Sequence, residues 1–417
     1  MLRKVMEVLY PCAAGLDVHK KMVMACRRRL LGDGQVEVEV REFGTTTAQL
    51  KQLATWLAEW RCTHVALEST GVLWVPIWNV LEGQFTLLLA NARQLKGVPG
   101  RKRDVKDAEW IGQLMQCGLL KPSFVPSAQV RHWRTLTRQR MKLLDQRTSV
   151  ANRLHKVLQQ GNLKLSSVAS DVLGVSGRVI LKALIEGESD AATLARLTQG
   201  RLKAPEEKIV EALEGRLTDD QRWVLKQLWE QLTYLEEEIV RYDEQIRVQM
   251  QEYEEAIRRL LTIDLLERRS VENLLAEIGP DMSYFPRDDH LVSWAGLCPG
   301  SEESAKKNRS GKTPKGNPWL RRALVQPAWN AARRKDGYLG ALYRGIAARR
   351  GAKRAVVAVA RTILQAAWHI LSEGVEYKEL GGNYLDQKHG EQARHQLVKR
   401  LEKLGYEVSL RPKAVAS

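Results

Sequence analysis

The sequence has few features of a secreted or membrane protein. Its five cysteines, Cys12, Cys26, Cys62, Cys117 and Cys298, lie far apart, which argues against both a zinc motif and a disulfide framework. No apolar run approaches the roughly 20 residues that a membrane-spanning helix needs. The N-terminus also lacks the apolar core of a secretory signal. We therefore expect a cytoplasmic protein without a membrane partner.

Acidic residues are scarce in one long segment. The 417 residues include 66 Lys and Arg against 49 Asp and Glu, which gives a net charge of +17. Between Ala305 and Arg361 there are sixteen basic residues and one acid, Asp336, so this segment alone carries +15. A solvated surface normally mixes both signs, so the segment predicts contact with nucleic acid, with a solubilising surface as the alternative.

The length and the patterning predict several domains, because one hydrophobic core rarely organises so many residues. We expect strands over 12–18, 22–30, 36–43, 65–67 and 85–89, and helices over 46–60 and from about residue 75. Three strands, a helix and a strand form the opening of a ribonuclease H type α/β fold. The expected domains are this α/β domain over 1–125, a helical and coiled-coil region over 126–256, a mainly α-helical domain over 257–372 and a polar tail over 373–417.

Four carboxylates fall where this fold would use them. Asp17 lies inside the first strand and Glu68 ends the fourth, places where a carboxylate is costly unless it binds a cation or finds a partner. Asp104 and Asp107 open a later helix three residues apart, so they share one face. Oxygen ligands suit Mg²⁺, and the four acids predict two magnesium ions for phosphoryl transfer. Each acid alone also fits a strand end or a helix cap.

A basic loop precedes the last two acids. Residues 96–106 include Arg101, Lys102 and Arg103. Cations beside an acidic site let a phosphate backbone approach it, so we expect this loop to contact nucleic acid. A basic loop with no ligand is the alternative.

The middle of the chain predicts long helices. Arginines interleave with apolar residues over 127–160, which suits a helix along nucleic acid about as well as a solvated helix face. From Leu225 to Ile246 apolar residues alternate spacings of three and four, which is a heptad seam. We expect a coiled coil that joins subunits into a dimer or tetramer, with packing inside one subunit as the alternative.

The basic segment contains a polar loop from Ser301 to Gly316, followed by Asn317-Pro318, an N-cap and a first-turn proline. The free amides expected at this helix start, with Arg321 and Arg322, predict a phosphate site. The remaining cations expected to contact nucleic acid are Lys306, Lys307, Arg309, Lys312 and Lys315. A serine hydroxyl here can attack a phosphodiester once it is activated, although a loop serine is more often a turn residue. Trp294, Trp319 and Trp329 are candidates for stacking on bases, with a place in the core as the alternative.

Three acidic motifs, Gly15-Leu-Asp-Val-His-Lys20, Ala66-Leu-Glu-Ser-Thr-Gly71 and Lys102-Arg-Asp-Val-Lys-Asp-Ala108, resemble those of the insertion-sequence 110 family of transposases. The N-terminal Asp-Glu-Asp-Asp domain of that family is similar to the Holliday-junction resolvase RuvC. The resemblance implies a RuvC-like domain in which Asp17, Glu68, Asp104 and Asp107 are catalytic and bind the metal.

In the C-terminal half, Ser293-Trp-Ala-Gly-Leu-Cys-Pro-Gly300, Glu303-Ser-Ala-Lys306 and the stretch from Ser310 to Arg321 resemble the second domain of the same family. The resemblance implies a serine nucleophile, placed at Ser304, with Ser310 and Ser301 as alternatives. It also implies excision and insertion of DNA at a short target, a tetrameric synapse, guidance by a bridge-type noncoding RNA and association with the bacterial nucleoid.

Two other functions stay open on the sequence alone. One is a structure-selective DNA nuclease that uses only the four carboxylates and water bound to the metal. The other is a nucleic-acid-binding repressor in which the acids are structural. Loss of the serine separates the recombinase from the nuclease, and binding without any cleavage would favour the repressor.

Overall fold

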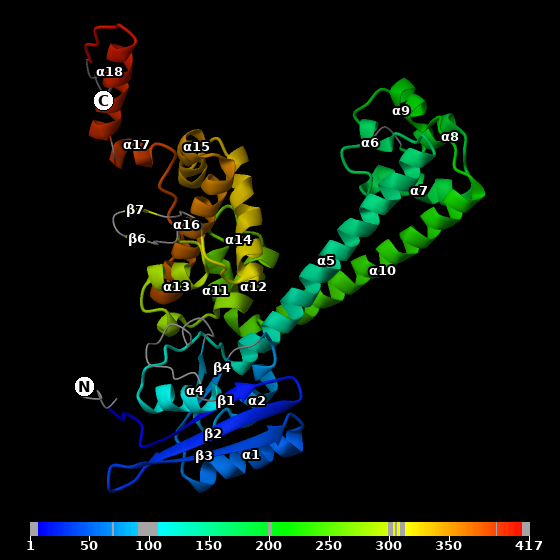
Figure 1. The fold of residues 1–417 in the computed structure, drawn as a ribbon. Coiled ribbons are helices and arrows are strands. Elements are labelled where there is room, and N and C mark those ends of the chain that lie inside the picture. The colour runs from blue at the N-terminus through cyan, green and yellow to red at the C-terminus, as the bar shows by residue number, and fades with distance from the viewer. Residues whose placement is uncertain are drawn as a thin grey trace. The chain divides into compact units, whose positions relative to one another are not determined.

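The structure is a computed structural model that describes residues 7–68, 71–90, 107–198, 202–298, 303–304, 307–308, 313–388 and 390–410. The chain divides into two compact units, Met1–Val125 and Pro126–Ser417. The first is a mixed α/β domain and the second is almost entirely helical (Figure 1). The predicted α/β sheet domain at the N-terminus and the predicted mainly helical remainder are confirmed.

A five-stranded mixed sheet forms the centre of the first unit, in the order β3-β2-β1-β4-β5. The strands are β1 (Cys12–Val18), β2 (Met22–Leu30), β3 (Val36–Gly44), β4 (His64–Glu68) and β5 (Thr86–Ala90). The first three form an antiparallel meander, while β4 runs parallel to β1 and β5 parallel to β4. The β2–β3 turn includes Gly34 at φ +82°, a conformation that favours glycine.

Helices cover both faces of this sheet. On one face lie α1 (Thr47–Glu59) and α2 (Trp74–Leu81), whose buried residues share a core with Leu16 and Leu67. The other face is covered by α4 (Asp107–Gln116), which packs on Ala13 and Ala66. Because successive side chains of a strand point to opposite faces, the alternation along β1 and β4 determines which residues face α4.

Two long helices and a helical insert open the second unit. The long helices are α5 (Ala128–Gln160) and α10 (Asp219–Gln249), which pack side by side (Figure 1). The insert between them contains α6 (Leu165–Val168), α7 (Val175–Glu186), α8 (Ala191–Arg196) and α9 (Glu206–Leu213). Thr218 begins α10 with a capping box closed by Gln221.

The heptad seam of α10 is buried within its own chain. Leu225, Leu232 and Ile239 are at most 4% exposed and pack in one core with residues of α5 such as Leu154. The periodicity therefore predicts the helix and its buried face correctly. The seam does not provide the contact between subunits expected from it, because α5 already covers it.

The remaining helices form the C-terminal part of the second unit. They are α11 (Glu254–Leu260), α12 (Arg268–Ile278), α13 (Asp288–Trp294), α14 (Pro318–Asn330), α15 (Tyr338–Arg350), α16 (Ala352–Glu373), α17 (Tyr384–Lys388) and α18 (Gly390–Lys403), with 3-10 turns at Gln251–Tyr253, Met282–Tyr284 and Ala331–Arg333. Two short strands, β6 (Glu303–Ser304) and β7 (Lys307–Asn308), pair between α13 and α14.

Among the described helices, α16 alone is long and apolar enough to cross a membrane. Sequence reasoning did not find this run. The buried residues of α16 include Val359, Ile363 and Ala367, and the helix packs against α13, α14 and α15. We interpret α16 as the central core helix of this domain.

Candidate active site and nucleic-acid surface

Two of the predicted carboxylates end adjacent parallel strands. Leu16 of β1 pairs with Leu67 of β4, and the next residue on each strand is Asp17 and Glu68, respectively. Both acids lie on the side of the sheet that faces α4, two residues beyond Gly15 and Ala66. The Asp17 side chain is 19% exposed, so this edge of the sheet is partly open to solvent.

A glycine contact places α4 against this edge. A Cβ atom added to Gly15 would lie 2.1 Å from the backbone nitrogen of Gly112 and 2.4 Å from the carbonyl oxygen of Ala108. The backbones of β1 and α4 can approach this closely only because Gly15 has no side chain. Asp107, the first residue of α4, directly precedes Ala108, so the glycine contact positions the start of the helix that carries the fourth predicted acid.

His19 is a neighbour of this site that sequence reasoning missed. Its Nε2 atom lies 3.0 Å from a carboxylate oxygen of Asp17. The signal was available, since a histidine two residues after an acid at a strand end can reach back to that carboxylate. His19 therefore belongs to the surroundings of Asp17.

The donor set suits magnesium in its chemistry, because Asp17, Glu68 and Asp107 all offer carboxylate oxygens. Within the described residues, no group of three His, Cys, Asp or Glu side chains lies close enough to hold a metal ion. Asp104 lies outside the described residues, as do Arg101, Lys102 and Arg103. The structure thus aligns two acids by strand register and positions the helix of a third.

The predicted serine lies in a short hairpin. Ser304 of β6 pairs through its backbone with Lys307 of β7, and Glu303 pairs with Asn308. Ser301, Ser310, Lys306, Arg309 and Lys312 lie outside the described residues.

The two ends of the serine-bearing loop are held together. A Cβ atom on Gly316 would lie 2.0 Å from the carbonyl oxygen of Ala295, and one on Gly296 would lie 2.6 Å from the nitrogen of Gly316. Arg321 strengthens this closure by donating to the carbonyl oxygen of Gly296 at 2.6 Å and to the hydroxyl of Thr313 at 3.0 Å. The segment between these ends is therefore anchored on both sides.

A buried carboxylate supports the second end of the loop. Glu277 of α12 is 2% exposed and accepts two hydrogen bonds from Arg138 of α5, at 2.7 and 2.8 Å. It also accepts one from the side-chain amide of Asn317 at 2.6 Å. The other side-chain atom of Asn317, Oδ1, accepts from the backbone of Trp319 and Leu320 and caps α14. The sequence gives no sign that Glu277 is buried or what it contacts.

The arginines of α5 have structural partners, an outcome that neither interpretation of this helix foresaw. Arg140 is fully buried and contacts Glu272, Asp243 and Asn273. Arg147 donates to Glu236 on α10. These contacts join α5 to α10 and α12, so this side of α5 is not a nucleic-acid surface.

Several cations predicted to bind phosphate already have partners. Arg322 forms a two-pronged ion pair with Asp145 of α5, with both distances at 2.5 Å. Arg321 closes the loop, and the first amides of α14 are occupied by Asn317. Lys315 is exposed. A phosphate role for these residues stays a prediction.

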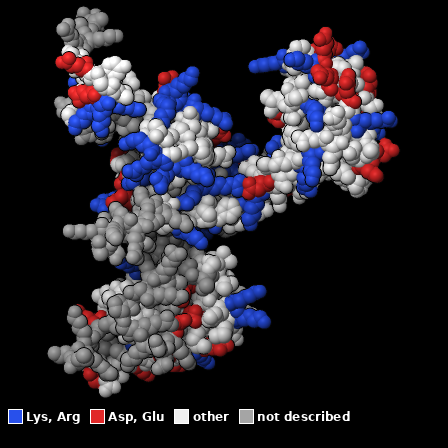
Figure 2. All heavy atoms as spheres, turned by 45° about the horizontal axis from the view of Figure 1, so that its top comes forward, with Lys and Arg blue, Asp and Glu red and all other residues white. Residues whose placement is uncertain are grey.

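A group of basic residues without such partners lies at the junction of α15 and α16. Arg349 and Arg350 end α15, and Lys353 and Arg354 open α16. All four are exposed, and none forms an ion pair with another residue in the described part of the chain. We call these four residues the basic turn. Figure 2 shows the Lys and Arg side chains gathered over the C-terminal helices.

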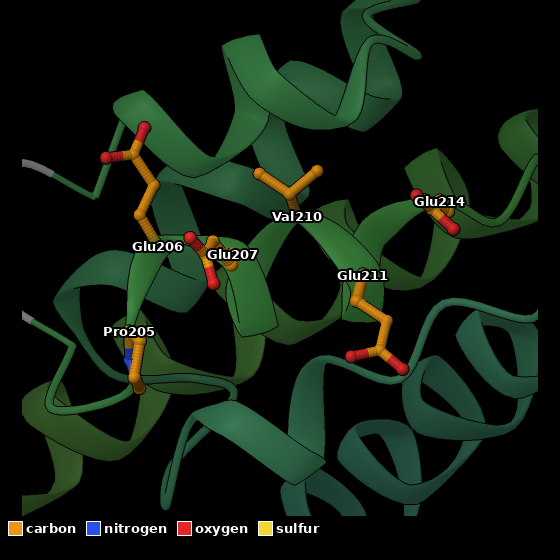
Figure 3. A pocket seen from close by; sticks show the side chains of 6 residues that line it. All are labelled: Pro205, Glu206, Glu207, Val210, Glu211 and Glu214. Carbon is orange, nitrogen blue, oxygen red and sulfur yellow. The ribbon is translucent and has the colours of Figure 1, made fainter.

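The helical insert has the opposite charge on one side. A shallow hollow beside α9 is lined by Glu206, Glu207, Glu211 and Glu214 together with Pro205 and Val210 (Figure 3). Carboxylates repel a phosphate backbone. This side of the insert is therefore unsuited to nucleic acid.

Comparison with known proteins identifies the family. Residues 14–162 match the Asp-Glu-Asp-Asp transposase model of IS110, and residues 257–344 match the model described as "Transposase IS116/IS110/IS902 family". The chain belongs to the IS110 family of transposases. The expected resemblance is thereby confirmed. The family match also supports the predicted activity of a DNA transposase or recombinase.

The chain is also similar to individual known proteins. A "Probable family 20 transposase" of Pseudomonas aeruginosa PAO1 is 27% identical over 369 residues, which are 87% of this chain and 94% of the relative. Two solved structures of Thermus thermophilus RuvC, one in complex with a Holliday junction substrate, each match 27% of this chain and 99% of their own. Their sequence identities are 14% and 12% and their TM-scores 0.21 and 0.20.

Proposed function

We propose that this IS110-family transposase excises and inserts an insertion sequence through a covalent serine intermediate, with Asp17, Glu68, Asp104 and Asp107 holding Mg²⁺. The observation that carries the proposal is the register of β1 and β4, which brings Asp17 and Glu68 to the same edge and face of the sheet. When bound, the metal would neutralise charge on the scissile phosphate and on the oxygens that enter and leave it.

Strand cleavage and rejoining then proceed in two steps. The Ser304 hydroxyl attacks the phosphorus atom, and the bond from phosphorus to one deoxyribose oxygen breaks as that oxygen takes up a proton. The ester on Ser304 conserves the bond energy. A hydroxyl of the partner DNA strand later attacks this ester, which rejoins DNA and restores the serine.

The anchored loop supports the choice of this segment. A nucleophile is effective only when it is held in position, and Gly296, Gly316 and Arg321 hold the two ends of the Ser304 loop. The exposed cations of the C-terminal domain provide the attraction for a phosphate backbone. A homo-oligomer, dimer to tetramer, and a bridge-type RNA from the element complete the proposal.

The test is a trapping assay. Wild-type protein, Ser304→Ala and Ser310→Ala are incubated with Mg²⁺, the noncoding RNA of the element and labelled donor and target DNA, and are then denatured. We expect covalently attached DNA in wild type and Ser310→Ala, and none in Ser304→Ala. Asp17→Asn should lose the adduct without losing DNA binding.

The other outcomes are equally informative. An adduct that persists in Ser304→Ala and disappears in Ser310→Ala or Ser301→Ala would assign the nucleophile to Ser310 or Ser301 instead. Free cleaved ends without an adduct in any sample would overturn the serine mechanism in favour of a metal-dependent nuclease. Recombination of the same DNA without RNA would remove the RNA partner from the proposal.

A further inference from the structure

Two cysteines far apart in the sequence meet at the start of the parallel strands. The sulfur atoms of Cys12, the first residue of β1, and Cys62, two residues before β4, lie 3.3 Å apart. Cys62 follows Cys12 by 50 positions, and the chain folds back so that the backbone N–H of Thr63 donates to the carbonyl oxygen of Cys12 at 3.3 Å. The spacing of the cysteines in the sequence gave no sign of this pair.

The geometry suits a disulfide. The two sulfur atoms already lie 3.3 Å apart, so the side chains point toward each other as a bond between them requires. A bond requires the two sulfur atoms to approach by about 1.3 Å from their present separation. Residues 61–62, which precede Thr63 and β4, can supply this shift without breaking the sheet, since β4 pairing begins at His64.

The two thiols differ in environment. Cys12 is partly exposed, while Cys62 is 6% exposed. The hydrogen bond from the Cys62 thiol, together with the charges of Arg29 and Arg27, lowers the pKa of Cys12 despite its partial burial. Burial raises the pKa of Cys26 to about 12 and also raises that of Cys117. A thiol that ionises readily beside cations and can be reached by solvent is the reactive kind.

We propose that Cys12 and Cys62 form a reversible dithiol–disulfide site that responds to hydroperoxides. The Cys12 thiolate attacks the peroxide, takes one oxygen to become a sulfenic acid, and releases hydroxide or alkoxide. The Cys62 thiol then attacks the sulfur of Cys12, and water leaves as the disulfide forms. An external dithiol returns both residues to thiols. The crosslink joins β1, which carries Asp17, to the segment that enters β4, which carries Glu68.

The full-length protein is treated with hydrogen peroxide, alkylated, digested and analysed by mass spectrometry. We expect the peptides of Cys12 and Cys62 to be joined, with the loss of two hydrogen atoms, and to separate after dithiothreitol. Cys117 and Cys298, which are also partly exposed, are internal controls and should remain alkylated. The oxidised protein should unfold at a higher temperature than the reduced protein, because the crosslink limits the unfolded chain.

Two variants separate the steps. Cys62→Ser should accumulate a sulfenic acid at Cys12 that dimedone captures, while Cys12→Ser should leave Cys62 unreacted. Oxidation of Cys12 no faster than that of Cys298 in wild type, with no joined peptide, would overturn the proposal. That result does not depend on whether either variant folds.

Discussion

Asn317 donates its side-chain amide to a carboxylate oxygen of Glu277 at 2.6 Å, and this hydrogen bond joins the start of α14 to the end of α12. The same carboxylate is paired with Arg138 and lies 3.4 Å from the side chain of Arg134. The second end of the Ser304 loop is thus anchored to a buried ion-pair network within the second unit.

Replacing Glu277 with Gln should destabilise the domain strongly. The change leaves two arginines without their buried countercharge, a loss that costs about 3 kcal/mol or more. Urea unfolding followed by circular dichroism measures it. Glu255→Gln is the matched control, because Glu255 pairs with Arg258 on an exposed surface and its loss should barely move the midpoint. Equal midpoints for the two variants would contradict the role of Glu277.

Gly15→Ala should displace α4 from β1. The new methyl group would overlap backbone atoms of Gly112 and Ala108, and backbone cannot move aside as a side chain can. We expect a cost of about 3 kcal/mol and loss of DNA cleavage, measured by thermal unfolding and by strand-cleavage assays. Gly32→Ala is the control, since a Cβ there meets nothing within 4 Å. A stable Gly15→Ala protein that cleaves DNA would refute the contact.

Much of the first domain could be predicted from its sequence, because its signals are local. The short apolar run of β1 and the spacing of Leu50, Leu53 and Leu57 can be read from neighbouring residues alone. The heptad seam of α10 was also visible. What covers that seam depends on α5, more than sixty residues earlier, and periodicity carries no information about the partner.

The buried ion pairs could not be predicted for the same reason. Arg140 and Glu272 look like ordinary surface residues in the sequence, and only the packing of α5 on α12 brings them to 2.5 Å. The net charge identified the basic segment, but it did not show which of its cations are paired with acids and which remain exposed. Arg322 is neutralised by Asp145, whereas Arg350 of the basic turn remains exposed.

Stability of the helical insert should fall in acid. Partial burial alone would raise the pKa of Glu236, but hydrogen bonds from Arg178 and Arg147 together lower it below its ordinary value of 4.5. A carboxylate with a lowered folded-state pKa stabilises the protein above its ordinary pKa, and this contribution is lost as pH falls through the folded value. Melting temperatures between about pH 7 and about pH 3 should therefore depend less on pH in Glu236→Gln. Glu238 pairs with the exposed Arg241, so Glu238→Gln should show the same pH dependence as wild type.

The basic turn should contribute to DNA affinity. Arg349→Ala with Arg350→Ala should weaken binding to duplex DNA of any sequence. The slope of log affinity against log salt should also fall by about 0.9 for each phosphate that the variant no longer neutralises. Fluorescence anisotropy over a salt series measures both. Arg258→Ala is the control, since this exposed arginine is neutralised by Glu255 and Glu376. An unchanged salt slope in the double variant would place the DNA elsewhere.

Trp329 should stack on an unpaired base. Of the three tryptophans considered for this role, Trp294 packs on Phe285 and Trp319 lies beside Arg138, whereas the Trp329 side chain is 44% exposed next to Tyr343. Trp329→Ala should weaken single-stranded nucleic-acid binding by about 1–3 kcal/mol, and Trp329→Phe should restore most of it.

Trp223→Ala tests whether the loss of any exposed tryptophan would weaken single-strand binding. Trp223 is 65% exposed on α10 but follows Asp219 and Asp220, where carboxylates repel phosphate. Its loss should leave affinity unchanged, measured by titration against a labelled single strand. If Trp223→Ala and Trp329→Ala weaken binding equally, stacking at Trp329 is not a specific contact. If only Trp329→Ala does so and phenylalanine rescues it, the aromatic ring itself carries the interaction, because phenylalanine keeps a face for the base and lacks the indole N–H.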